Sequence, residues 1–396
     1  MKITDIDFEE ERALIRVDFN VPLNDKLEVT DDTRIRRSLP TINYILANGG
    51  AVVLMSHLGR PKNGPEDQFS LRHLVGPLAD ILNRDVQFAE NCIGEEAFRL
   101  SSNLLSGDVL LLENLRFYKE EEKGDESFAE KLAKHGDIYV NDAFGTAHRA
   151  HASTATIANF FEKDKRCFGK LMAAELENAQ KVIKNSEAPF TAIIGGAKVS
   201  TKIDIIKNML DRADNILIGG GMAYTFFKAM GGNVGNSLVE DDKLETAKEV
   251  LEATKTCKAN VILPIDSLAA DRFSNDAEQK SVPSDDIPAG WMGLDIGAKA
   301  IREFSEIIKN SKTILWNGPM GVFEMDNFKI GTEDIAHAIA EATANGAFSL
   351  VGGGDSVAAI NQLGYDDKVS YVSTGGGAML EYFEGKTLPG VAALED

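Results

Sequence analysis

The chain has few of the features that mark secreted, membrane or metal-cluster proteins. Its 396 residues include three cysteines, Cys92, Cys167 and Cys257, which are odd in number and too far apart for a metal motif. No apolar run approaches the roughly 20 residues of a transmembrane helix, and residues 1–10 lack the apolar core of a signal peptide. We therefore expect a cytoplasmic protein with reduced thiols and no membrane partner.

Positive charge is scarce and unevenly placed. The chain has 62 Asp and Glu against 42 Lys and Arg, and its formal net charge is −20, so nucleic acid is not expected as a partner. Twelve arginines lie at or before Arg166, and three follow it. An acidic chain that gathers arginine in one half is expected to bind a small polyanion there, unless these arginines only form surface salt bridges.

Common nucleotide-binding fingerprints are missing too. No G-x-G-x-x-G follows the first expected strand of either half, which argues against a dinucleotide cofactor. Residues 384–387 resemble the end of a Walker A loop, but Leu380 stands where the first glycine of that motif belongs. The protein-kinase motifs are also absent. A phosphate-binding function therefore has to rest on other residues.

Apolar, β-prone segments alternate with helical stretches along both halves of the chain, which predicts parallel sheets. In the first half the expected strands are residues 13–21, 51–58, 108–115 and 138–144. In the second half they are residues 190–194, 215–218, 260–263, 313–316, 348–351 and 369–372. We predict an α/β fold of two doubly wound, Rossmann-like domains with a cleft between them.

A helix is expected between the halves, because apolar residues repeat at helical spacing through residues 170–183. We therefore assign residues 1–169 to a first domain, 170–184 to an interdomain helix and 185–384 to a second domain.

Polar residues stand at the carboxyl ends of the first-half strands, where parallel sheets form their binding crevices. Asp18 and Asn20 end the first strand two residues apart, so they are expected on one face. Arg34 falls in the first turn of an expected helix, where the helix dipole disfavours a cation and another use is indicated.

Three arginines occupy equivalent positions after later strands. Arg60, Arg116 and Arg149 each follow a strand end, and they are expected to converge on one anion in a common crevice. The histidines of these segments are either part of that site or ordinary core and capping residues. They are His57, His148 and His151.

The second half uses glycine where the first uses arginine. Glycine runs end four of its strands, at residues 195–196, 219–221, 352–354 and 375–377, which lets a ligand approach the backbone closely. Lys198 and Lys202 follow the first run four residues apart, hence on one face of an expected helix. Two lysines above such a strand end suit a polyphosphate, although ordinary solvated lysines are an alternative.

One stretch, Phe348–Ser356, runs from a strand through three glycines into an expected helix. The free N–H groups and the dipole of a helix N-terminus favour an anion there. Asp355 would repel bound phosphates unless a cation lay between them, so we predict Mg²⁺ at this residue. The alternative is a glycine-rich turn with an Asp or Ser N-cap.

Taken together, several long motifs resemble the phosphoglycerate kinase family, in order and over the whole chain. They lie at residues 16–22, 56–61, 112–117, 141–151, 195–199, 219–224, 316–324, 352–355 and 373–378.

The resemblance implies two substrate sites and a monomer. The first domain would bind 3-phosphoglycerate or 1,3-bisphosphoglycerate through Asp18, Asn20, Arg34, His57, Arg60, Arg116 and Arg149. The second domain would bind Mg-ADP or Mg-ATP through Lys198, Lys202, Gly219, Gly293, Asn317, Glu324, Gly353, Gly354, Asp355 and Ser356. The tail, about residues 385–396, would pack back on the first domain.

The implied reaction is reversible phosphoryl transfer from 1,3-bisphosphoglycerate to ADP in glycolysis. The acceptor carboxylate of the reverse direction is already ionised at neutral pH, so no general base is required. We assign the transferring group to Arg34, Lys202 and the N–H groups of Gly375 and Gly376. The alternatives are an NAD-dependent oxidoreductase and a non-catalytic anion-binding protein.

Overall fold

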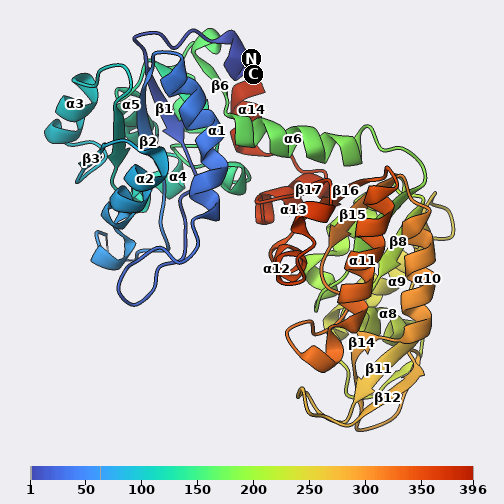
Figure 1. The fold of residues 1–396 in the computed structure, drawn as a ribbon. Helices are drawn as coiled ribbons and strands as arrows, with labels where there is room; N and C mark the ends of the chain where they lie inside the picture. The colour runs from blue at the N-terminus through green and yellow to red at the C-terminus, as the bar shows by residue number, and fades with distance from the viewer. Residues whose placement is uncertain (1, 63, 396) are drawn as a thin grey trace. The chain divides into compact units, whose positions relative to one another are not determined.

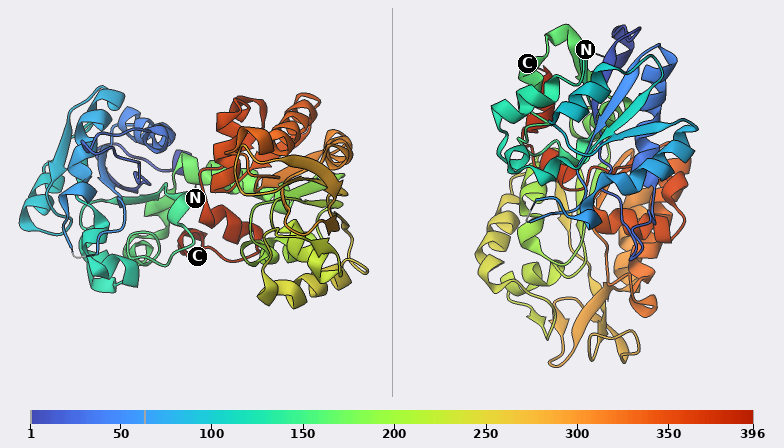
Figure 2. Two further views of the ribbon diagram at one scale, coloured as in Figure 1. Left: turned by 90° about the horizontal axis from the view of Figure 1, so that it is seen from below. Right: turned by 90° about the vertical axis from the view of Figure 1, so that its left-hand side faces the viewer.

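The computed structural model describes residues 2–62 and 64–395 and divides the chain into two compact units. Unit 1 comprises Met1–Glu177 with Thr387–Asp396, and unit 2 comprises Asn178–Lys386. Each unit has its own sheet flanked by helices (Figures 1 and 2). The predicted α/β class with two parallel sheets is confirmed.

Unit 1 is built on a six-stranded parallel sheet in the order β3-β4-β2-β1-β5-β6. Its strands are β1 (Arg12–Arg16), β2 (Ala51–Met55), β3 (Val86–Ala89), β4 (Val109–Leu112), β5 (Ile138–Asn141) and β6 (Arg166–Phe168). Its connecting helices are α1 (Thr33–Ala47), α2 (Val75–Leu82), α3 (Glu95–Ser102), α4 (Lys119–Lys123) and α5 (Glu126–Ala133).

Alternate side chains of the central strands enter two different cores. Ile15 and Leu54 belong to one buried cluster, whereas their neighbours Leu14 and Val53 belong to another. Successive side chains of a strand point to opposite faces, so both faces of this sheet are covered. Such strands are apolar throughout, which is why β2 and β4 were recognisable as continuous apolar runs.

The chain reverses its direction of winding at the middle of the sheet. The strands β2, β3 and β4 all lie on one side of β1 in the sheet. The chain then crosses to the other side of β1, where β5 and β6 lie. Parallel pairing sets Arg16 of β1 opposite Asn141 of β5. The loops that follow these two strands therefore leave the sheet at its switch point, where open α/β sheets bind ligands.

Unit 2 repeats this plan with the order β10-β8-β7-β15-β16-β17. Its strands are β7 (Phe190–Ile194), β8 (Asn215–Ile218), β10 (Asn260–Ile262), β15 (Thr313–Asn317), β16 (Phe348–Val351) and β17 (Tyr371–Val372). Its helices are α7 (Ile203–Met209), α8 (Ala223–Ala229), α9 (Leu244–Ala253), α10 (Ala298–Lys309), α11 (Ile330–Ala344), α12 (Gly354–Gln362) and α13 (Gly377–Phe383). The switch point lies between β7 and β15.

Two small sheets of unit 2 were not predicted. One is antiparallel, with the order β12-β11-β14, and the other pairs β13 with β9. Their strands are β9 (Asn233–Val234), β11 (Asp266–Ala270), β12 (Gln279–Pro283), β13 (Asp286–Ile287) and β14 (Met292–Ile296). These strands are short, and β12 has no buried residue, so they lack the apolar signal of a buried parallel strand.

Helix α6 (Lys170–Ile183) has the bounds expected from its apolar spacing and passes from unit 1 into unit 2. Asp142, the residue after β5, accepts hydrogen bonds at the helix N-terminus from Leu171 N at 2.9 Å and Met172 N at 3.1 Å. Burial raises the pKa of Asp142 to about 7. A Cβ on Gly169 would lie 2.1 Å from the Asp142 carboxylate, so this approach requires glycine.

The last helix, α14 (Pro389–Glu395), belongs to unit 1 and lies beside β6 (Figure 1). Gly390 N donates to the carbonyl oxygen of Ala147 at 2.9 Å, and Gly390 O accepts from Asn141 Nδ2 at 3.4 Å. The tail is thus hydrogen-bonded to the loop after β5.

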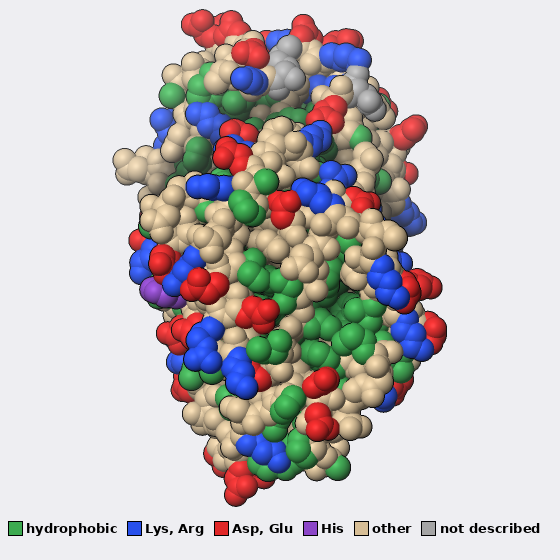
Figure 3. Space-filling view, turned by 90° about the vertical axis from the view of Figure 1, so that its right-hand side faces the viewer, with side chains coloured by type: hydrophobic (Ala, Val, Ile, Leu, Met, Phe, Trp, Pro, Cys, Tyr) green, Lys and Arg blue, Asp and Glu red, His purple; other side chains and the backbone are tan. Residues whose placement is uncertain are grey.

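Acidic and basic side chains are interspersed on the face shown in Figure 3, and hydrophobic side chains gather in an area of its lower half. None of the described helices has both the length and the apolar character needed to cross a membrane.

Candidate active site

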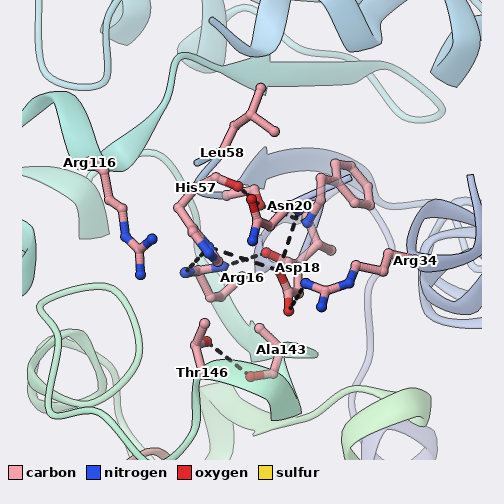
Figure 4. A network of polar contacts seen from close by, with 12 residues as sticks. Arg16, Asp18, Asn20, Arg34, His57, Leu58, Arg116, Ala143 and Thr146 are labelled. Carbon is pink, nitrogen blue, oxygen red and sulfur yellow. Dashed lines mark hydrogen bonds and ion pairs between the residues drawn. The ribbon is translucent and has the colours of Figure 1, made fainter. Parts of the chain in front are cut away.

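Unit 1 carries a cluster of arginines at the carboxyl ends of its strands. Arg34, in the first turn of α1, donates from Nη1 to Asp18 Oδ2 at 2.9 Å. Arg34 and Arg116 approach from opposite sides, with Arg16 and His57 between them (Figure 4). Of the three strand-end arginines expected to converge, Arg116 lies in this cluster, and it is accompanied by another arginine, Arg16.

His57 lies at the centre of this cluster. Its Nδ1 is 3.3 Å from Arg16 Nη2 and 3.9 Å from Asp18 Oδ1. Burial lowers the pKa of His57 well below its ordinary value, and the neighbouring arginines, Arg16 first, lower it further. The imidazole is therefore neutral at physiological pH, and the positive charge of the site resides on guanidinium groups.

Arg116 lies in a 3₁₀ turn, η4 (Leu115–Phe117), directly after β4. Its Nη1 donates to the carbonyl oxygen of Gly59 at 2.7 Å, and its Nε lies 3.4 Å from a Glu122 carboxylate oxygen. Burial lowers the pKa of Arg116; Glu122 opposes this, and Arg16 and Arg149 lower it further. Like charges held together in this way favour the binding of an anion between them.

The prediction that Asp18 and Asn20 share a strand face is wrong, because β1 ends at Arg16. The chain leaves the sheet when Phe19 N donates to the side chain of Ser56 at 2.8 Å instead of to a strand carbonyl. Asn20 Oδ1 accepts from Gly59 N at 2.8 Å. Asn20 thus fixes the loop after β2, whereas Asp18 faces the arginines.

The other residues considered for this site are Arg60, Arg149, His148 and His151. Arg60 follows the fixed Gly59 and is exposed, and Arg149 is exposed in the loop after β5. Arg149 is close enough to lower the pKa of Arg116 and of His151. The pKa of His151 falls to about 4, first through burial, so this imidazole is also neutral.

Unit 2 contains a cleft of about 680 Å³, the size range of small-molecule sites. Apolar side chains line most of it, among them Leu238, Met292, Leu294, Val322 and Phe323. Glycines, which have no side chain to cover the backbone, occupy several further lining positions: Gly196, Gly220, Gly221, Gly293 and Gly321. An apolar cleft with glycine backbone in its wall suits a planar ring.

Three of the predicted nucleotide residues line this cleft: Gly293, Glu324 and Asp355. Gly293 lines it, donates from its N–H to Ser237 Oγ at 2.9 Å, and approaches Tyr224 so closely that a Cβ would lie 1.9 Å from the phenol oxygen. Glu324 lines it with an exposed carboxylate. Gly219 is not among the lining residues; it is buried against the side chain of Met320.

Lys202 lies beside the cleft, next to the lining residue Gly196, and Asn317 ends β15 at the switch point of the sheet; this region is called the polar end of the cleft. Lys202 Nζ donates to Asn317 Oδ1 at the end of β15. Burial lowers the pKa of Lys202, whereas the carboxylates of Asp355 and Glu384 raise it. The ammonium group of Lys202 has three N–H donors and gives one of them to the neutral amide of Asn317, so its other donors can bind an anion.

Lys198 and Lys202 do not lie on one helix face, contrary to prediction. A 3₁₀ turn, η8 (Val199–Thr201), separates them, and α7 begins only at Ile203. Lys198 is exposed, and Lys202 is partly buried. The spacing of four residues was therefore a misleading signal.

The strand–glycine–helix stretch after β16 folds as predicted, and α12 begins at Gly354. Gly353 has a φ of 93°, and a Cβ there would lie 2.7 Å from Asn317 Nδ2, so both conformation and space require glycine. Asp355 is exposed in the first helical turn and lines the cleft. The buried Ser356 hydroxyl accepts from Gly318 N at 2.5 Å and so fixes the loop after β15.

The glycines assigned to the transferring group, Gly375 and Gly376, directly precede α13. Gly376 is its N-cap residue, with a φ of 51°. The N–H of Gly375 donates to Ser373 Oγ at 3.0 Å, so it would have to exchange this partner to bind a ligand.

A family model described as phosphoglycerate kinase matches residues 3–386. Phosphoglycerate kinase of Porphyromonas gingivalis is 52% identical over 418 residues, covering 100% of both chains. Phosphoglycerate kinase 3, cytosolic, of Arabidopsis thaliana is 52% identical, covering 100% of this chain and 98% of its own. The chain belongs to the phosphoglycerate kinase family. The solved phosphoglycerate kinase of Coxiella burnetii matches with a TM-score of 0.91 at 37% identity, covering 100% of this chain and 98% of that chain.

Some residues that shape the arginine cluster of unit 1 were missed from sequence. Arg16 was counted only as one of many arginines, although it is fully buried between His57 and Ser153. Glu121 is also fully buried, and it was not singled out by sequence from its neighbours Glu120 and Glu122. The signal for Arg16 was an arginine inside an apolar strand, since such a residue is rarely buried without a partner.

Proposed function

We propose that this member of the phosphoglycerate kinase family, a phosphotransferase with a carboxyl group as acceptor, catalyses reversible glycolytic phosphoryl transfer from 1,3-bisphosphoglycerate to ADP. The observation that carries this proposal is the arginine cluster of unit 1, in which Arg16, Arg34 and Arg116 surround a neutral imidazole. That arrangement suits a small acid bearing a phosphate and a carboxylate. The apolar cleft of unit 2 suits a nucleoside.

The acid substrate is assigned to the unit 1 residues predicted from sequence, and its anionic groups are assigned to the guanidinium groups. Asp18 and Asn20 orient Arg34 and the loop after β2, and they offer acceptors to a substrate hydroxyl. The proposed substrate residues are Asp18, Asn20, Arg34, His57, Arg60, Arg116 and Arg149.

The nucleotide is assigned to unit 2, with its base in the apolar cleft and its phosphates at the polar end. Glu324, exposed at the cleft wall, offers an acceptor to a ribose hydroxyl. The proposed residues are Lys198, Lys202, Gly219, Gly293, Asn317, Glu324, Gly353, Gly354, Asp355 and Ser356. Gly219 and Ser356 act by shaping the loops, since both are buried against neighbouring main chain or side chains.

Asp355 is the residue proposed to hold Mg²⁺. No group of three or more His, Cys, Asp or Glu side chains among the described residues forms a ready-made metal site. One exposed carboxylate at the polar end of the cleft fits the way in which Mg²⁺ is usually bound, through one or two carboxylates and the phosphates of a substrate. The ion would neutralise phosphate charge there.

The chain's own residues then align the reactants and neutralise charge on the transferring group. In the ATP-forming direction a phosphate oxygen of ADP attacks the acyl phosphate, and the leaving carboxylate needs no proton. We assign Arg34 from unit 1 and Lys202 from unit 2 to the transferring phosphoryl group. The N–H groups of Gly375 and Gly376 are further candidate donors to it.

The two substrates are assigned to different units, so in-line transfer requires the units to close. Reacting atoms have to come within about 3–3.5 Å, and each ligand alone contacts one unit, so neither alone favours the closed state. The junction at α6 and the tail before α14 are the proposed flexing segments. We expect the radius of gyration from small-angle scattering to fall only with 3-phosphoglycerate and Mg-nucleotide together. An unchanged radius with both ligands would contradict closure.

A coupled assay with ATP, Mg²⁺ and 3-phosphoglycerate tests the proposed activity directly. ADP release that depends on all three components is the expected result. Binding of 3-phosphoglycerate without turnover would instead support a non-catalytic anion-binding protein.

Arg149→Ala should raise the KM for 3-phosphoglycerate far more than the KM for ATP. Loss of one charge-assisted contact costs about 1.5–3 kcal/mol, or roughly ten- to a hundredfold in affinity. Steady-state kinetics with each substrate varied in turn provide the measurement. Arg99→Ala, which removes an exposed arginine of α3 from the same unit, is the matched control. An equal rise in both KM values would argue against a separate acid site.

We further propose a cytoplasmic monomer whose ligands are small molecules, with neither nucleic acid nor membrane as partner. The net charge of −20 disfavours polyanionic partners, and the three free cysteines fit a reducing compartment.

A further inference from the structure

A buried carboxylate lies beneath the arginine cluster of unit 1. Glu121, in α4, is fully buried, and its Oε1 accepts from Ser153 Oγ at 2.6 Å while its Oε2 accepts from Ser153 N at 3.0 Å. His151 Nδ1 lies 3.8 Å from Oε1. Burial raises the pKa of Glu121, and Arg16 first among its neighbours lowers it. Buried carboxylates require such compensation.

From this carboxylate the polar contacts continue to the substrate-facing groups. Ser153 Oγ accepts from Arg16 Nε at 2.8 Å, and Arg16 Nη2 lies 3.3 Å from His57 Nδ1. Asp18 lies 3.9 Å beyond the imidazole and pairs with Arg34 at 2.9 Å. The chain of contacts therefore spans the ends of β1 and β2 and the start of α1.

Glu121 also joins the loop after β4 to the loop after β5. Its main-chain oxygen accepts from Ala152 N at 2.9 Å. Three residues later, Gly124 has a φ of 64°, and a Cβ there would lie 2.6 Å from the carbonyl oxygen of Ala150. The first loop carries Arg116 and the second carries Arg149, which lies close enough to lower the pKa of Arg116, so this contact ties the positions of the two arginines to each other.

Stability alone does not account for a fully buried carboxylate and guanidinium, because well-packed apolar side chains often stabilise a core as much. We propose that Glu121 is a positioning residue for the acid-binding site: through Ser153 it holds Arg16, and with it the groups that face the substrate. This inference rests on the proposed binding of 3-phosphoglycerate in unit 1.

Glu121→Gln distinguishes a positioning role from a purely electrostatic effect, because the two predict opposite changes in the Kd for 3-phosphoglycerate. Removing a negative charge near the arginines would by itself strengthen the binding of an anion. If Glu121 positions Arg16, binding weakens instead, and we expect the Kd for 3-phosphoglycerate by titration calorimetry to rise about tenfold, the size of one weakened charge-assisted bond. The KM for ATP should stay unchanged. An unchanged or lower Kd would overturn the proposal.

Two further variants make the test specific. Ser153→Ala keeps both charges and removes only the linking hydroxyl, so it should also raise the Kd. The double variant should raise the Kd little more than either single variant does, because both substitutions interrupt the same chain of contacts. Glu120→Gln removes the same charge from an exposed position of the same helix and should leave the Kd unchanged. If Glu121→Gln does not fold, the test rests on Ser153→Ala, and an unchanged Kd in that variant would reject the proposal.

The unsubstituted protein distinguishes failure of this inference from failure of the proposed function. If it does not bind 3-phosphoglycerate at all, the substrate assignment is wrong. If it binds normally and the variants bind equally well, only the role of Glu121 is wrong.

Discussion

Replacing Arg34 by alanine is expected to lower kcat on the order of a hundred- to a thousandfold, the usual cost of removing one donor to a transition-state charge. Arg34 occupies the first turn of α1, where the helix dipole disfavours a cation. Its side chain is 40% exposed, and one nitrogen pairs with Asp18 at 2.9 Å. The remaining donors of the guanidinium are therefore available to a phosphoryl group.

The comparison with Arg36→Ala isolates this effect. Arg36 lies in the same helix and pairs with Asp32 at 2.8 Å, away from the cluster, so kcat should not change. Arg34→Lys should recover only part of the activity, because an ammonium lacks the planar fork of a guanidinium. If Arg34→Ala raised the KM for 3-phosphoglycerate and left kcat intact, Arg34 would be a binding residue and not a catalytic one.

Asp355→Asn is expected to reduce turnover about a hundredfold at ordinary Mg²⁺ concentrations, because a neutral amide is a far weaker ligand than a carboxylate for this hard cation. The Mg²⁺ concentration for half-maximal activity should rise. Binding of metal-free ATP should be equal or tighter, since the substitution removes a negative charge beside the phosphates. Titration of the rate with Mg²⁺, together with calorimetry of metal-free ATP, provides the measurement.

The control for Asp355→Asn is Asp366→Asn, which removes an exposed carboxylate elsewhere in unit 2. It should leave the Mg²⁺ dependence unchanged. Full Mg²⁺-dependent activity in Asp355→Asn would show that another group holds the metal.

The buried parallel strands were the most predictable part of the fold. Three of them, Phe190–Ile194, Asn215–Ile218 and Phe348–Val351, have the expected bounds, because both of their faces are covered and each is apolar at all but one position. The strands β3 and β6 were not predicted, since polar residues such as Gln87 and Arg166 interrupt them. Each lies at an edge of the sheet and pairs with a single strand, β3 with β4 and β6 with β5.

The candidate site was predictable where side chains follow strand ends, and it was not where the chain leaves regular structure. Arg116 is found in the cluster because strand ends meet at one edge of a sheet. The prediction that Lys198 and Lys202 share a helix face was wrong, because a 3₁₀ turn lies between them. Glu121 could not be predicted, because nothing in its neighbouring sequence distinguishes a buried glutamate from an exposed one.

The placement of α14 has a consequence for synthesis of the protein. All of unit 2 is contiguous in the chain, whereas unit 1 is completed by the segment that follows it. On a ribosome, the loop carrying Arg149 therefore lacks its hydrogen bonds at Ala147 and Asn141 until Gly390 has emerged. A nascent chain would complete unit 2 before unit 1, so the site proposed for the acid substrate is completed only when translation has passed the last helix.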